Sequence, residues 1–139
     1  MKVVVPVSLI LLMSLFVRAD DATTQPAVIQ ASDKDAITAN AGKDAIVEGT
    51  ISKAEWSRSG AVLNIEFKDN DQSRFMAVIF QRQRENMDKQ FAGDVAKSLT
   101  GAKVRIKGKL GEYRDRPQII INEGTQITIV EAAPSTQQS

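Results

Sequence analysis

The residues best suited to chemistry lie in one short loop, Tyr113-Arg-Asp-Arg-Pro117. The loop combines an aromatic ring, which can stack on a flat ligand, with the guanidinium groups of Arg114 and Arg116, which can hold phosphates. This combination suits single-stranded nucleic acid, in which bases stack on rings and cations contact the backbone. Pairing of an arginine with Asp115 inside the loop is the alternative use of these charges.

Two further features could serve the same ligand. Trp56 stands beside a Ser-Arg turn, and it is either a stacking platform or an apolar plug at the end of the fold. Basic residues also alternate along one stretch, at Lys103, Arg105, Lys107 and Lys109. Such a stripe either binds a polyanion or is a solvated strand face that discourages edge-to-edge pairing, and we favour the second interpretation.

The composition argues against metal centres and catalysis. The 139 residues include no His and no Cys, so zinc, copper, iron–sulfur and haem sites lack their usual ligands. Asp69-Asn-Asp71 resembles the start of a calcium loop, but the required Gly and the distal Glu are missing, which favours a hairpin turn. The other acidic residues do not form an arrangement suited to a nuclease. We therefore expect no enzyme activity and no cofactor.

The N-terminus has the layout of a secretory signal peptide. Met1-Lys2 is a minimal positive region, residues 3–17 form an apolar stretch, and Ala19 ends a fitting cleavage motif. A membrane anchor is the alternative, but the apolar stretch is short for a span and acidic residues follow it. We expect residues 1–19 to be removed and the protein to be exported, to the periplasm or to the medium, without a membrane anchor.

The rest of the chain divides by composition. Removal of residues 1–19 would leave 16 of the 18 basic side chains against 17 acidic ones, a net charge of about −1, so any basic surface must be local. Residues 20–43 are polar and predict a flexible leader, with a weak helix around Ser32–Ala41 that begins with N-cap residues. Residues 131–139 predict a disordered tail, which leaves 44–130 as the folded domain.

Hydrophobic periodicity in this domain predicts five strands and one helix. Apolar residues indicate strands over 46–56, 62–68 and 74–80, the third of them central and covered on both faces. From Glu85 to Leu99 they recur every four positions, which indicates an amphipathic helix interrupted at Gly93. A hairpin follows, with strands at 103–110 and 119–130, the second one bent near Gly124.

This order of elements is that of the OB-fold, a five-stranded Greek-key barrel with one helix between strands 3 and 4. Gly49 and Gly108 fall on the strand faces expected to be buried, where barrel strands must bend or approach one another closely. We therefore expect a mainly β protein with this barrel architecture.

Three runs also resemble a known family. These are Val47-Glu-Gly-Thr-Ile51, Gly101-x-x-Val-x-Ile-x-Gly-x-Leu110 and Tyr113-Arg-Asp-Arg-Pro-Gln-Ile119, and they are similar to the nucleic-acid-binding OB-fold family of the anticodon-binding type. The resemblance covers residues 44–130. In that family the ligand lies across the second and third strands, between the first turn and the hairpin loop. The signal peptide, length and single domain are also similar to those of small exported bacterial OB-fold proteins.

The resemblance implies a site for single-stranded nucleic acid or another polyanion. By position it implicates Trp56, Arg58, Lys68, Arg74, Tyr113, Arg114 and Arg116. The outward residues Asn64 and Glu66 of the second strand, with Met76 and Val78 of the third, would complete the floor of the groove. The alternative function is a periplasmic interaction module that binds a protein or a small ligand.

Overall fold

The computed structural model describes residues 26–133, which form a mainly β structure. The predicted signal peptide at 1–19, leader positions 20–25 and tail positions 134–139 lie outside the described residues. Eight strands make one mixed sheet in the order β6-β7-β4-β3-β2-β5-β8, with β1 paired to β2 outside this path. The strands are β1 Val28–Gln30, β2 Asp44–Trp56, β3 Val62–Phe67, β4 Met76–Phe80, β5 Lys103–Lys109, β6 Gly111–Tyr113, β7 Arg116–Ile121 and β8 Ile127–Glu131.

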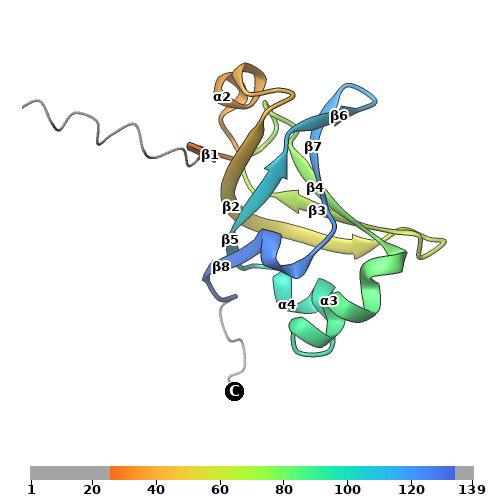
Figure 1. Ribbon diagram of the computed structural model, residues 1–139. Coiled ribbons are helices and arrows are strands. Elements are labelled where there is room, and N and C mark those ends of the chain that lie inside the picture. Colours follow the sequence, from red (N-terminus) through yellow and green to blue (C-terminus); the bar gives the residue numbers. More distant parts are fainter. Residues whose placement is uncertain (1–25, 134–139) are drawn as a thin grey trace, which may run out of the picture.

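Strand β2 belongs to both halves of the sheet (Figure 1). Its first half pairs parallel with β1 and antiparallel with β5, and its second half pairs antiparallel with β3. The register shifts between Ile51 and Lys53, where the strand passes from one half to the other. At Gly49 an added Cβ atom would lie 2.9 Å from the Cβ of Ala31, so the predicted close approach at this glycine is confirmed.

The expectation of a five-stranded barrel is too simple. All five predicted strands have counterparts, but the sheet contains eight strands and its hydrogen-bonded path is not closed. Three local features account for the difference: β1 adds a strand before β2, β6 resumes pairing after a break at Leu110, and the 3₁₀ turn η3 (Gly124–Gln126) separates β7 from β8. Strand β4 is central as predicted, since it pairs with β3 on one side and β7 on the other. The predicted cover on both faces is incomplete, because Met76 and Val78, although buried, line an open pocket on the outer face.

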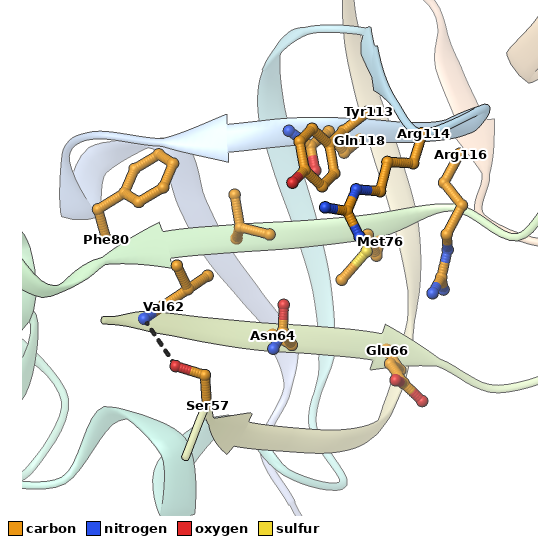
Figure 2. A pocket seen from close by; sticks show the side chains of 11 residues that line it. Ser57, Val62, Asn64, Glu66, Met76, Phe80, Tyr113, Arg114, Arg116 and Gln118 are labelled. Atoms are coloured by element: carbon orange, nitrogen blue, oxygen red, sulfur yellow. Dashed lines mark hydrogen bonds between the residues drawn. The ribbon is translucent and has the colours of Figure 1, made fainter. Parts of the chain in front are cut away.

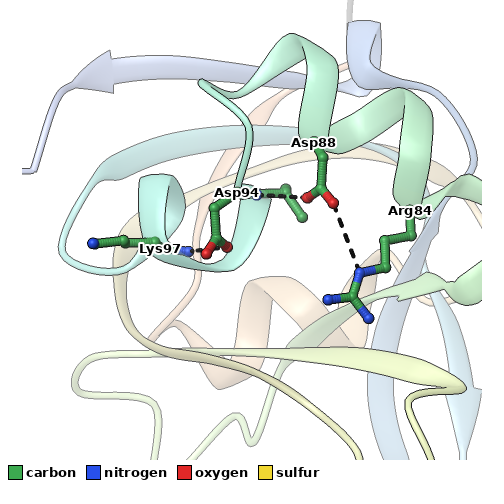
Figure 3. Close-up of polar contacts among 5 residues, drawn as sticks. Arg84, Asp88, Asp94 and Lys97 are labelled. Carbon is green, nitrogen blue, oxygen red and sulfur yellow. Dashed lines mark hydrogen bonds and ion pairs between the residues drawn. The ribbon is translucent and has the colours of Figure 1, made fainter.

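The predicted amphipathic helix is two short helices, α3 (Arg84–Gln90) and α4 (Val95–Leu99), which follow the 3₁₀ turn η2 (Gln81–Gln83). The break falls at Gly93, whose φ of +91° favours glycine. Figure 3 shows two contacts that hold the break: the N–H of Val95 donates to Asp88, and that of Lys97 donates to the Asp94 side chain. The four apolar positions that predicted the helix are all buried, namely Met87, Phe91, Val95 and Leu99.

The prediction of a flexible leader is wrong for residues 26–43, which are part of the fold. Strand β1 pairs with β2, and helix α2 (Lys34–Ala39) lies where the weak helix was predicted, with Asp33 as its N-cap. Ile37 of this helix is 1% exposed. Few apolar residues suffice here because they join a core that the other strands already form. At the other end, Glu131 belongs to β8 and not to the tail.

The elements around the sheet determine which surface is open. Helix α2 lies at one end of the molecule, and α3 and α4 lie at the opposite end (Figure 1). Inside, β5 comes close to β7 at Gly108, where an added Cβ atom would lie 2.7 Å from Cγ2 of Ile119. The outer face of β3, β4 and β7 is hollowed beside the β6–β7 hairpin.

Candidate functional site

A pocket of about 560 Å³ lies on the outer face of β3, β4 and β7, below the β6–β7 hairpin (Figure 2). We call this pocket the groove. Successive side chains of a strand point to opposite faces, so alternate residues form its floor. The register places Glu66 opposite Met76, and Met76 in turn opposite Gln118. The floor residues of β3 and β4 are Val62, Asn64, Glu66, Met76, Val78 and Phe80.

The wall of the groove is the hairpin that joins β6 to β7. Tyr113 pairs with Arg116, so the turn consists of Arg114 and Asp115 alone. Their φ angles are 52° and 62°, and positive values at both central positions identify a type I′ turn, which matches the twist of the flanking strands. The turn therefore holds Tyr113, Arg114 and Arg116 beside the floor without help from a longer loop.

The two arginines of the hairpin are held by contacts other than ion pairs. The guanidinium carbon of Arg114 lies 5.2 Å from the centre of the Tyr113 ring, and Nε of Arg116 donates to the backbone carbonyl of Arg74 at 3.2 Å. Within residues 26–133, none of the ion pairs shorter than 4.0 Å includes Arg114, Asp115 or Arg116. The pairing inside the loop that was the alternative interpretation is therefore not formed, and both guanidinium groups can meet a ligand.

The structure brings together only some of the predicted site residues. Tyr113, Arg114 and Arg116 line the groove with the four floor residues that the sequence indicated. Arg74 lies near them, and it contributes its carbonyl oxygen to Arg116. The role of each in ligand binding stays a prediction.

The other three predicted residues lie outside the groove lining. Trp56 is partly buried against the core, and the guanidinium carbon of Arg84 lies 4.6 Å from its ring centre. Arg58 is exposed in the turn after β2. Lys68 borders a separate small cleft together with Glu48 and Lys103.

Sequence reasoning missed several residues of the groove: Ser57, Val62, Phe80 and Gln118. Two of them could have been found. Extending the alternation of Met76 and Val78 by one step gives Phe80, and extending that of Asn64 and Glu66 in the other direction gives Val62. Gln118 could not have been found in this way, because only the parallel pairing of β4 with β7 places it beside Met76.

The basic stripe of β5 lies on a different surface from the groove. Each of three stripe residues faces an acid on a neighbouring strand: Lys109 opposite Asp44, Arg105 opposite Glu48, and Lys103 opposite Glu131. Opposite charges in directly facing positions stabilise a sheet and reduce the local positive potential. The favoured interpretation of the stripe as a strand face is thus supported by its pairing partners.

Glu48 is the acid at the centre of this surface and is only 8% exposed. Its carboxylate accepts a hydrogen bond from Nε2 of Gln30 at 2.9 Å and pairs with Nε of Arg105 at 3.2 Å. The hydrogen bond from Gln30, together with the charge of Arg105, holds the pKa of Glu48 below its usual value although burial opposes this. The residue is therefore a buried ionised group that supports the sheet.

Neither a metal cluster nor a membrane span is evident between residues 26 and 133. No three acidic side chains in that range gather closely enough to hold a metal ion. No helix there combines the length and the hydrophobicity that crossing a bilayer requires. The groups that the groove offers are hydrogen-bonding amides, a carboxylate, two guanidinium groups and two aromatic rings.

Comparisons with known proteins give a likeness of fold. No family model matches the sequence, and no curated protein matches it either. An aspartyl-tRNA synthetase structure from Leishmania major Friedlin matches with a TM-score of 0.56 and 12% identity, over 85% of this chain and 23% of the synthetase chain. The chain thus spans less than a quarter of the synthetase, and identity at this level shows a shared fold alone. A nucleic acid-binding lipoprotein from Klebsiella pneumoniae subsp. pneumoniae MGH 78578 matches with a TM-score of 0.39 and 15% identity, over 81% of this chain and 98% of the lipoprotein.

Proposed function

We propose that this chain is a non-catalytic binding protein of the OB-fold type that holds single-stranded nucleic acid, or another extended polyanion, in the groove. The observation that carries the proposal is the pair of guanidinium groups, Arg114 and Arg116, which stand over a largely apolar floor without ion-pair partners within the described residues. Such groups suit phosphates, and the rings of Phe80 and Tyr113 suit bases.

Two further points support this proposal. The groove lies on the second and third of the predicted OB-fold strands, which is where the resembled family holds its ligand. The likeness of fold to part of a synthetase chain agrees with an OB-fold, whose five strands correspond to β2, β3, β4, β5 and β7.

We also propose export to the periplasm or the medium, on the signal-like sequence of residues 1–19.

One observation favours a second candidate function. Val62, Met76, Val78 and Phe80 give the floor an apolar character that would also suit a protein side chain or a small ligand. An exported interaction module would use the groove in this way, and its binding would respond weakly to salt. Salt dependence therefore separates the two functions.

The test is fluorescence anisotropy of a labelled single-stranded oligonucleotide titrated with the protein at several salt concentrations. Arg114→Ala/Arg116→Ala is expected to weaken binding about tenfold or more. The slope of the logarithm of the binding constant against the logarithm of the salt concentration is also expected to become shallower by about 1.4. Each lost phosphate contact with a single strand removes about 0.7 from this slope.

Lys107→Ala/Lys109→Ala is the matched control, since it removes the same charge from the stripe of β5. We expect this control to change affinity by less than about threefold. Equal losses in the two double variants, or no binding at low salt, would contradict the proposal.

A further inference from the structure

The groove contains one acid, Glu66, among its cations. This carboxylate lies on β3 and faces the floor, opposite Met76 on one side and Lys53 on the other. The amine of Lys53 pairs with Glu55 at 3.2 Å, not with Glu66. Throughout the described part of the chain, no cation lies within 4.0 Å of the Glu66 carboxylate. Glu66 is thus an acceptor that its own neighbours leave open to a ligand.

Figure 2 shows how this acid is placed relative to the hairpin. Arg114 and Arg116 descend from the hairpin at the same end of the groove as Glu66, while Phe80 and Val62 lie at the other end. A simple polyanion would gain from the arginines and lose by repulsion from Glu66. The charged end of the groove is complementary to a ligand that presents an anion on one side and hydrogen-bond donors on the other.

Nucleotides carry both groups, but the bases differ in their donors. A carboxylate has two acceptor oxygens and is best matched by two adjacent N–H donors. Guanine presents such a pair on its Watson–Crick edge, from N1–H and the 2-amino group. Adenine and cytosine present an amino group beside an acceptor nitrogen, and thymine presents one N–H between two carbonyl oxygens. Single-stranded bases are read on these edges.

We infer that the groove prefers strands that contain guanine, and that Glu66 reads the guanine Watson–Crick edge while Arg114 and Arg116 hold the adjoining phosphates. The inference rests on the proposed function, because it needs a nucleic acid in the groove. Asn64 lies one step along β3 on the same face, where its amide can donate to a carbonyl oxygen such as O6. The apolar end at Phe80 accepts a neighbouring base by stacking.

The experiment compares three labelled pentamers by anisotropy: all thymidine, the same strand with a central guanosine, and the same strand with a central inosine, which lacks the 2-amino group. The wild-type protein is expected to bind the guanosine strand about tenfold more tightly than the thymidine strand, with inosine between them. In Glu66→Gln, one of the two acceptors becomes a donor, so the preference is expected to fall below about twofold. Because the repulsion is also removed, binding of the thymidine strand is expected to stay equal or to improve.

Glu85→Gln is the matched control, because it makes the same chemical change on the exposed face of α3 outside the groove lining. It is expected to keep the full preference. Equal binding of all three strands by the wild-type protein, or an unchanged preference in Glu66→Gln, would overturn the inference and leave the proposed function standing. Failure of the wild-type protein to bind any strand would overturn the proposed function as well.

Discussion

Two surfaces of this protein carry clusters of positive charge, and they differ in what faces those charges. On the stripe of β5, acids of β2 and β8 stand directly opposite Lys109, Arg105 and Lys103. In the groove, Arg114 and Arg116 have no ion-pair partner among residues 26–133 and stand over a floor that is apolar except for Asn64 and Glu66. An acid directly opposite a cation lowers the local positive potential, and among residues 26–133 Arg105 also forms an ion pair with Glu48, whereas the groove arginines have no acid opposite them in the sheet register and are available to a ligand.

The largest effect is expected where the strand of the stripe meets a strand of the groove, at Gly108. In Gly108→Ala the new Cβ would lie 2.7 Å from Ile119 Cγ2, so the Ile119 side chain or the backbone that carries it must shift. Overpacking of this kind costs about 1–3 kcal/mol of the free energy of unfolding. Thermal melting followed by circular dichroism measures it.

Gly111→Ala is the control for this change, since its added Cβ would meet nothing nearer than 3.8 Å. It is expected to leave the melting temperature close to that of the wild type. Identical melting of the two variants would show that the contact between β5 and β7 is not as tight as described.

A smaller effect is expected from removal of the central acid of the stripe surface. Glu48→Gln loses a buried charge that pairs with Arg105, and we expect the free energy of unfolding to fall by about 1–2 kcal/mol near neutral pH. Glu66→Gln makes the same change in the groove, where no pair is lost, and is expected to stay within about 0.5 kcal/mol. Urea denaturation measures both, and equal losses would remove the distinction between the two surfaces.

The same pair of variants gives a pH test. The pKa of Glu48 is lower in the folded protein than in the unfolded chain, where it is about 4.3. Ionised Glu48 therefore stabilises the fold fully when the pH is above the pKa of the unfolded chain. This stabilisation is lost as the pH falls through the pKa of the folded protein. The difference in the free energy of unfolding between the wild type and Glu48→Gln is therefore expected to be largest at neutral pH and to shrink in acid. A difference that stays constant down to the folded pKa and below would contradict the role given to the charge.

The smallest effect concerns the turn that holds the groove arginines. Asp115 has φ of 62°, which glycine adopts without cost, so Asp115→Gly is expected to raise the free energy of unfolding by about 0.5 kcal/mol. Asp71→Gly, in another turn but without a positive φ, is expected to lower it by a similar amount. Denaturant melts of the two variants should move in opposite directions, and a shared direction would count against the type I′ turn.

Local patterns in the sequence were enough to identify most elements and their buried faces. The alternation in β3 placed Asn64 and Glu66 on one outward face, because a strand turns successive side chains to opposite sides whatever its neighbours are, whereas Met76 and Val78 of β4 were indicated only by the family resemblance. The combination of Tyr113 with Arg114 and Arg116 was visible because the three residues lie within one short loop of the sequence. The mainly β character and the helical break at Gly93 also followed from local signals.

What the sequence left undecided depends on contacts between distant segments. Nothing local showed that β1 would pair with β2, or that β7 would lie parallel to β4 and bring Gln118 to the groove. The turn with Trp56 looked as suitable for a ligand as the hairpin did, yet Trp56 packs on the core beside Arg84. The sequence by itself determined which residues carry charge and which face of each strand is buried, since periodicity is a property of one segment. Only the tertiary structure decided which charges are neutralised and which remain open to a ligand, because that depends on the register between strands far apart in the chain.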